Sequence, residues 1–198
     1  MTLHHTSSYK TGNHELSAGA EILLEQMPVD MTFPQVDEID PDVTTAPTVS
    51  VKDTVRLENY ALFVQDAYSF TKDLTVRFGI RAEYPDFGDF QPIVMPRGSA
   101  VYRLSENDTL SACAGIYANR PEAYTLFKDF GNPRLGYEKA NHYGLAWFRN
   151  FGSNGTLSIE PYYKTLYHLA IEDSDNEYED SGNGEVFGVD LSYKIRKD

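Results

Sequence analysis

The sequence predicts an all-β protein, an antiparallel transmembrane β-barrel segment of about eight strands. Three observations carry this prediction. Apolar and polar residues alternate with a period of two in one segment after another, which is typical of strands whose two faces meet different environments. Aromatic residues lie at the ends of the apolar faces, as they do in outer-membrane barrels. Short turns and longer connections alternate between the strands, as the two sides of such a barrel require.

The alternation is clearest in the hairpin of residues 59–84, NYALFVQDAYSFTKDLTVRFGIRAEY. In its second half every second residue is apolar, and the positions between them carry Arg77, Arg81 and Glu83. Its first half has the same period, with a tyrosine at each end of the apolar face. Residues 70–73 between the halves are mostly polar and predict a tight turn. Each strand is about ten residues long, which suffices to cross a bilayer at a tilt.

The same period predicts the other strands in order along the chain. The eight strands are expected at residues 15–25, 59–69, 74–84, 94–104, 109–117, 138–149, 156–167 and 186–195. Short turns are expected at 70–73, 105–108 and 151–154, and longer connections at 27–56, 85–93, 118–137 and 168–185. Pro161 removes a donor from the seventh strand, and we expect a β-bulge there.

The hairpin also carries a family resemblance. The run FVQDAY at 63–68, followed by LTVRFGIRAEY at 74–84, resembles the barrel of TonB-dependent outer-membrane receptors. Further matches follow in the same order: PRG at 96–98, YEK at 137–139 and GVDL at 188–191. The ordered set of motifs covers most of residues 13–197.

This resemblance implies a plugged barrel of about 22 strands. Residues 1–198 would then be a partial β-barrel domain from which the plug domain is absent. The start of the chain lacks the features of a signal peptide, and its last residues complete a strand, so we expect a segment of a longer protein.

The function that the resemblance implies is energy-coupled uptake of a large scarce nutrient, such as an iron chelate, cobalamin, a glycan or a peptide, across the bacterial outer membrane. The implied partners are outer-membrane lipid, the plug domain of the same protein and an inner-membrane energy-coupling protein. The alternative is a complete eight-stranded barrel with a structural or adhesive role, since eight strands can close around packed side chains. A barrel enzyme is not expected, because no Ser/His or His/Asp pair lies at a strand end on the long-loop side.

Composition excludes several other classes. A net charge of −13 argues against a nucleic-acid partner, because phosphate binding needs a basic face. The single cysteine, Cys113, excludes an internal disulfide and is expected to be an inert thiol on the inward face. No run of 18 apolar residues exists, so no transmembrane helix is expected.

No cofactor or metal site is expected from the histidines, which lack ligand spacing; His142 is expected to be an inward-facing structural residue. Residues 171–180 contain six acids, which predict a solvated loop, with a hard-cation site as the alternative.

The most informative polar residues are four arginines on the inward faces of the third and fourth strands. They are Arg77, Arg81, Arg97 and Arg103. One interpretation is that they pair with inward acids along the lumen wall, such as Glu83, Glu160 and Asp190. The other is that some of them hold the plug or an anionic substrate in a complete barrel.

Overall fold

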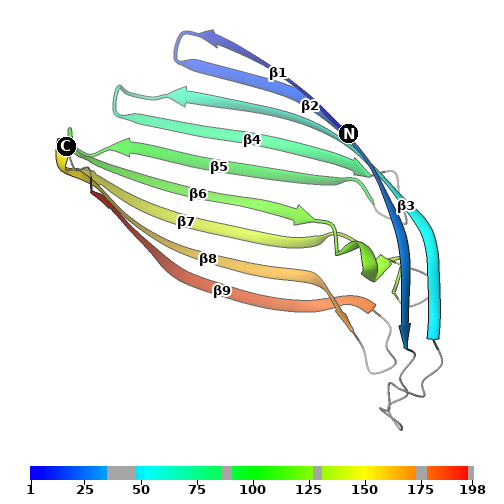
Figure 1. Ribbon diagram of the computed structural model, residues 1–198. Coiled ribbons are helices and arrows are strands. Elements are labelled where there is room, and N and C mark those ends of the chain that lie inside the picture. Colours follow the sequence, from blue (N-terminus) through cyan, green and yellow to red (C-terminus); the bar gives the residue numbers. More distant parts are fainter. Residues whose placement is uncertain (35–47, 86–90, 127–130, 173–177, 196–198) are drawn as a thin grey trace.

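The computed structural model describes residues 1–34, 48–85, 91–126, 131–172 and 178–195, which form one antiparallel sheet with its strands in the order of the sequence (Figure 1). The strands are β1 (Thr2–Thr11), β2 (His14–Pro34), β3 (Thr48–Ser69), β4 (Leu74–Pro85), β5 (Ile93–Arg103), β6 (Asp108–Asn119), β7 (Glu138–Asn150), β8 (Gly155–Glu172) and β9 (Tyr178–Ile195). Two short 3-10 helices, η1 (Ala123–Leu126) and η2 (Gly152–Asn154), lie in the connections. The all-β antiparallel prediction is confirmed.

The predicted number of strands is wrong by one, because the sequence reading missed β1. The outward face of β1 mixes apolar and polar residues and therefore forms no apolar row. These residues are Leu3, His5, Ser7 and Tyr9. A two-residue turn at Gly12 and Asn13 joins β1 to β2. Gly12 has φ 55°, a left-handed conformation that favours glycine and suits a tight hairpin turn.

Two of the expected long connections are shorter than predicted, because the paired strands extend into them. β2 and β3 stay in register from His14↔Tyr68 to Pro34↔Thr48, far beyond the apolar part of either strand. β8 continues to Glu172, and β9 begins at Tyr178, inside the segment expected to be an acidic loop. Backbone hydrogen bonding can extend a hairpin where no apolar face is needed, so the hydrophobic period underestimates strand length.

The register places all the predicted outward residues on one continuous face. Leu62 lies opposite Ala82, Phe78 opposite Gly98, and each row continues in this way across the neighbouring strands. Large apolar side chains on this face are widely exposed, with Phe187 at 82% and Leu191 at 72%. An apolar surface spread over a whole sheet exceeds what soluble monomers carry, and lipid is the environment that suits it.

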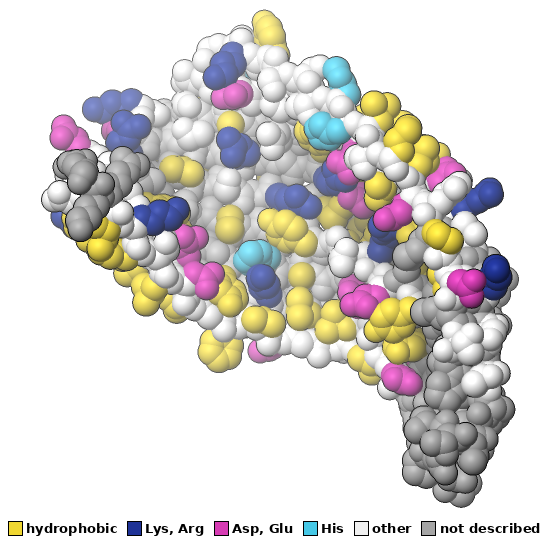
Figure 2. Space-filling model, viewed as in Figure 1, with side chains coloured by type: hydrophobic (Ala, Val, Ile, Leu, Met, Phe, Trp, Pro, Cys, Tyr) yellow, Lys and Arg dark blue, Asp and Glu magenta, His cyan; other side chains and the backbone are white. Residues whose placement is uncertain are grey.

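The opposite, concave face is polar and is the one seen in Figure 2, where charged side chains lie over the hollow of the sheet. We call this face the inner wall. Most of its buried apolar side chains lie toward the long-connection end, near the connection between β6 and β7, whereas Ala67 lies close to the turn at 70–73. Met95 and Leu135, at the long-connection end, are each 1% exposed. The structure therefore has a small core on the inner wall and none on the lipid-facing side of the described residues.

The bulge expected at Pro161 lies elsewhere. The pairs Gly144↔Tyr162 and Trp147↔Ile159 keep the same register on both sides of Pro161, and the pairing only lapses between them. Proline lacks the N–H that would donate to β7, so the ladder skips that position without inserting a residue. The register between β8 and β9 shifts twice, between Tyr167 and Leu169 and between Leu169 and Ile171. The first shift falls at His168, whose φ is 57°.

Short turns and long connections alternate as predicted. The turns at 12–13, 70–73, 104–107 and 151–154 all lie on one side of the sheet (Figure 1). β1 and β9 are the outermost strands of an open sheet and do not pair with each other. Among the described residues, no helix has the length and apolar character needed to cross a membrane.

Candidate functional site

The four predicted arginines all lie on the inner wall, and their strands β4 and β5 are neighbours as expected. The register pairs Arg77 with Ser99 and Arg97 with Gly79, so these two arginines are diagonal neighbours. Arg77, Arg81 and Arg97 line one hollow of about 360 Å³. Arg103 lies near the short-turn end and lines a different hollow with Glu106 and Lys194. The structure thus brings three of the four together.

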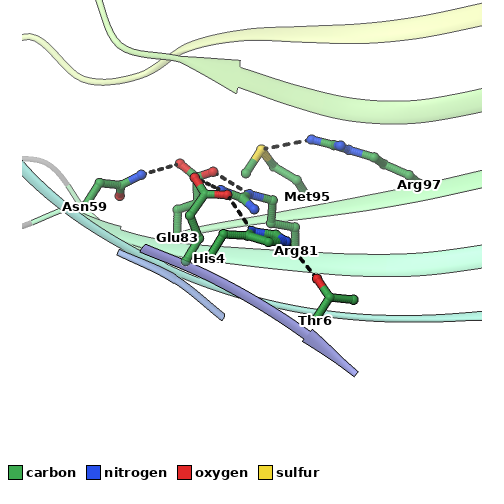
Figure 3. Close-up of polar contacts among 8 residues, drawn as sticks. His4, Thr6, Asn59, Arg81, Glu83, Met95 and Arg97 are labelled. Atoms are coloured by element: carbon green, nitrogen blue, oxygen red, sulfur yellow. Dashed lines mark hydrogen bonds and ion pairs between the residues drawn. The ribbon is translucent and has the colours of Figure 1, made fainter. Parts of the chain in front are cut away.

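Arg81 is the centre of an ion-pair network that joins β2 and β4 across β3 (Figure 3). Its Nε lies 2.6 Å from Oε1 of Glu83, and its Nη2 lies 3.4 Å from Oε1 of Glu21. Asn59 donates from its Nδ2 to the second oxygen of Glu83 at 3.1 Å. The side chains of Arg81 and Glu83 are only 20% and 13% exposed. Water and salt therefore weaken their attraction less than that of an exposed surface pair.

His4 extends the network to β1. Its Nδ1 lies 3.4 Å from Oε2 of Glu21, and its Nε2 shares a 2.7 Å hydrogen bond with Thr6 Oγ1. The ring stacks on Phe63 with centroids 6.0 Å apart. Sequence reasoning missed His4 because it missed β1, and the two-residue turn signal at Gly12 and Asn13 could have revealed that strand.

The connection between β6 and β7 folds over this network. Tyr137, just before β7, is buried at 5% exposure. Burial first, and then the nearby Glu83 carboxylate, raise the pKa of Tyr137 to about 12, while the positive charges of Arg120 and Arg81 act in the opposite direction. Arg120, at the start of the same connection, lies 3.2 Å from Glu25 on β2. Farther along, Asn132 donates from Nδ2 to the backbone oxygen of Tyr178 on β9 at 2.7 Å.

Arg97 is held by contacts other than ion pairs. Its guanidinium lies over the ring of Tyr117, 4.4 Å from the centroid, and its Nη2 lies 4.0 Å from the Met95 sulfur. Gly115 makes this possible, since a Cβ there would lie 3.0 Å from Arg97 Cγ and 3.2 Å from the Tyr117 ring. The Tyr117 ring in turn lies 5.7 Å from that of His142, which faces the inner wall as predicted.

The predicted pairing of arginines with acids holds only for Arg81. Glu160 and Asp190 lie directly opposite each other on β8 and β9, far along the sheet from β4. Among the described residues, no carboxylate forms an ion pair with Arg77, Arg97 or Arg103. The expectation that Glu160 and Asp190 neutralise these arginines is therefore wrong within the described part of the chain.

The remaining predicted features are Cys113 and the acidic stretch 171–180. Cys113 lies on the inner wall and is exposed. No group of three or more His, Cys, Asp and Glu side chains that could hold a metal ion occurs in the described ranges. Residues 173–177, half of the acidic stretch expected to be a loop or cation site, lie outside the described residues.

Comparison with known proteins assigns the fold. The ferric-catecholate import receptor Fiu of Escherichia coli matches with a TM-score of 0.71 at 16% identity, over 98% of this chain and 34% of that chain. The siderophore receptor PirA of Pseudomonas aeruginosa gives 0.73 at 16%, over 97% and 36%. The RagAB peptide importer gives 0.68 at 16%, over 98% and 27%. No curated protein sequence matches the chain.

The chain spans about a third of the length of these solved structures or less. At such low identity they establish the fold alone. The family itself is shown by sequence, because the profile described as "TonB dependent receptor-like, beta-barrel" matches residues 2–196. The chain therefore belongs to the family of TonB-dependent receptors and forms part of an outer-membrane β-barrel.

Proposed function

We propose that the chain is part of the wall of an outer-membrane receptor that imports a large scarce nutrient with energy supplied from the inner membrane. One observation carries the proposal: a single antiparallel sheet of nine strands has an apolar convex face and a charged concave one. A wall of this kind suits a barrel whose interior is wet or filled by a polar domain. Family membership supplies the energy-coupled character.

Residues 1–198 form a partial barrel in this proposal, and the plug domain and further strands belong to other parts of the full-length protein. The solved relatives, about three times as long as this chain, support that view. So does the open sheet, because β1 and β9 each keep an unpaired edge among the described residues, and lipid does not tolerate such edges.

The nutrient in this proposal is an iron chelate, cobalamin, a glycan or a peptide. The similar structures include a ferric-catecholate receptor, a siderophore receptor and a peptide importer, which favours iron chelates and peptides as the first candidates. The proposed partners are outer-membrane lipid, the plug domain and an inner-membrane energy-coupling protein. The four arginines of the inner wall would face whichever of the plug or substrate fills the interior.

An uptake experiment tests the transport function. The full-length gene is deleted, and cells are supplied with each labelled nutrient class in turn, with and without a proton uncoupler. We expect one class whose uptake falls on deletion, returns on complementation and stops with the uncoupler. If the deletion leaves the uptake of every nutrient class unchanged, the proposal is contradicted.

A refolding experiment tests the partial barrel. Residues 1–198 are refolded in detergent and assayed for heat-modifiable migration on gels, which is the sign of a closed barrel. We expect aggregation or association without a heat-modifiable monomer. A monomeric, protease-resistant, heat-modifiable species would instead favour a small complete barrel with a structural or adhesive role.

A further inference from the structure

Two arginines on the inner wall share a hollow in which no described acid lies. Arg77 of β4 and Arg97 of β5 line it together with Gln65, Ser99 and Cys113, and its volume is about 360 Å³. Its lining contains no Asp or Glu. Arg81 also reaches the hollow, but Glu21 and Glu83 already neutralise it. The unneutralised charge therefore belongs to Arg77 and Arg97.

The contacts of Arg97 engage one of its two Nη atoms, since Nη2 lies 4.0 Å from the Met95 sulfur. No other hydrogen bond of its guanidinium is formed among the described residues. Its guanidinium carbon lies over the Tyr117 ring, 4.4 Å from the centroid. The planar fork of a guanidinium matches the two oxygens of a carboxylate or the oxygens of a phosphate. The cation–π contact restrains the side chain before any anion arrives, which lowers the entropic cost of binding.

The strand register keeps the space between the two arginines open. Gly79 lies directly opposite both Gln65 and Arg97, so no side chain fills the middle of the row. Ser99 lies opposite Arg77 on one side and Cys113 on the other. The Ser99 hydroxyl and the Gln65 amide therefore supply neutral donors beside two cations, which is the composition of an oxyanion site.

We propose that Arg77 and Arg97 form an oxyanion site on the inner wall, which takes a carboxylate, phosphate or sulfonate group. This rests on the proposed function, because it requires the inner wall to face the interior of a complete barrel. The anion has two sources with the same chemistry: an acidic side chain of an interior segment of the same protein, or an anionic group of the imported nutrient.

The native thiol of Cys113 reports on this site. It lines the hollow, is exposed, and lies opposite Ser99. The full-length receptor in outer-membrane vesicles is labelled with a sulfonate-bearing and a trimethylammonium-bearing methanethiosulfonate reagent of equal size. A Cys113→Ser variant defines the labelling that belongs to this thiol. The double variant Arg77→Gln/Arg97→Gln tests the site, and Arg103→Gln is the control because Arg103 lines another hollow.

We expect the sulfonate reagent to label Cys113 about tenfold faster than the cationic one at low salt, since two positive charges lie close by. The preference should vanish in the double variant and persist in Arg103→Gln. Inorganic phosphate at millimolar concentration should slow the sulfonate reagent in wild type and not in the double variant. If wild-type Cys113 is labelled, equal rates for the two reagents overturn the proposal, and so does an unchanged preference in the double variant.

Labelling also separates the two sources of the anion. If wild-type Cys113 is protected from both reagents and the double variant is labelled, an interior segment of the same protein occupies the site. If wild type is labelled with the sulfonate preference, the site is open to a soluble anion. Protection in both wild type and the double variant overturns the proposal. No step uses uptake, so a receptor that imports normally can fail this test, and one that fails to import can pass it.

Discussion

Replacing Arg81 should destabilise the barrel more than replacing any other arginine of the inner wall. Arg81 separates the carboxylates of Glu21 and Glu83, at 3.4 Å and 2.6 Å. Arg81→Gln leaves both acids without their shared cation. Removing one partner of a fully buried pair costs about 3–5 kcal/mol. Because the Arg81 side chain is a fifth exposed and surface pairs contribute little, we expect a loss of about 2–3 kcal/mol in the free energy of unfolding.

A double-mutant cycle isolates the pair from the rest of the wall. Glu83→Gln alone should cost about 1–2 kcal/mol, since Asn59 still donates to the new amide oxygen. The double variant Arg81→Gln/Glu83→Gln should lose less unfolding free energy than the two single variants lose together. The difference should be about 1 kcal/mol or more, as expected for residues in contact. Arg103→Gln is the matched control and should change stability by less than about 0.5 kcal/mol.

Urea unfolding of the full-length receptor in lipid vesicles, followed by heat-modifiable migration and tryptophan fluorescence, measures these differences. An Arg81→Gln variant as stable as the Arg103→Gln control contradicts the argument. So does strict additivity of Arg81→Gln and Glu83→Gln, because it means that the 2.6 Å contact contributes no coupling.

Three further outcomes are expected. Spin labels on a Cys113→Ser background should be reached by lipid-soluble oxygen at Phe78 and far less at Thr75, which faces the inner wall; equal accessibility would contradict the assignment of the two faces. Epitope tags in the connection 173–177 should be detected on intact cells and tags in the turn 151–154 only after permeabilisation, and the reverse result would invert the orientation. The difference in phenolate absorbance between wild type and Tyr137→Phe should titrate near pH 12. Because the folded pKa of Tyr137 lies above the ordinary value of 10.0, its contribution to stability should be present below pH 10 and lost as pH rises through 12; a difference titration centred near pH 10 would contradict this.

The alternation of apolar and polar residues predicted most of the strands, because one face of each strand meets lipid and the other meets the polar interior. β4 and β5 have the predicted bounds to within a residue, and their four arginines lie on the predicted face. Even Arg81 and Glu83 could be paired from sequence, since residues two apart on a strand share a face. β1 could not be found in this way, because its faces do not differ in polarity.

The rest of the site depends on information that no single strand contains. Glu21 reaches Arg81 only because the register of β2, β3 and β4 aligns them in adjacent rows, and a slip of one residue would turn Glu21 to the lipid face. Tyr137 and Arg120 belong to a connection whose inward fold has no period to predict it. Turn chemistry and strand register, rather than hydrophobic pattern, determine these contacts.

The connection between β6 and β7 has a mechanical consequence for the wall. Arg120 contacts Glu25 on β2, Asn132 contacts Tyr178 on β9, and the backbone N–H of Asn132 donates to the oxygen of Thr125 at 2.6 Å, which joins the two halves. The connection is thus a chord drawn across the arc of eight strands from β2 to β9. These contacts oppose flattening of the sheet, because β2 and β9 cannot move apart across the concave face while they hold. Two side-chain contacts and one backbone hydrogen bond on the concave face thus favour the curvature that any further strands continue.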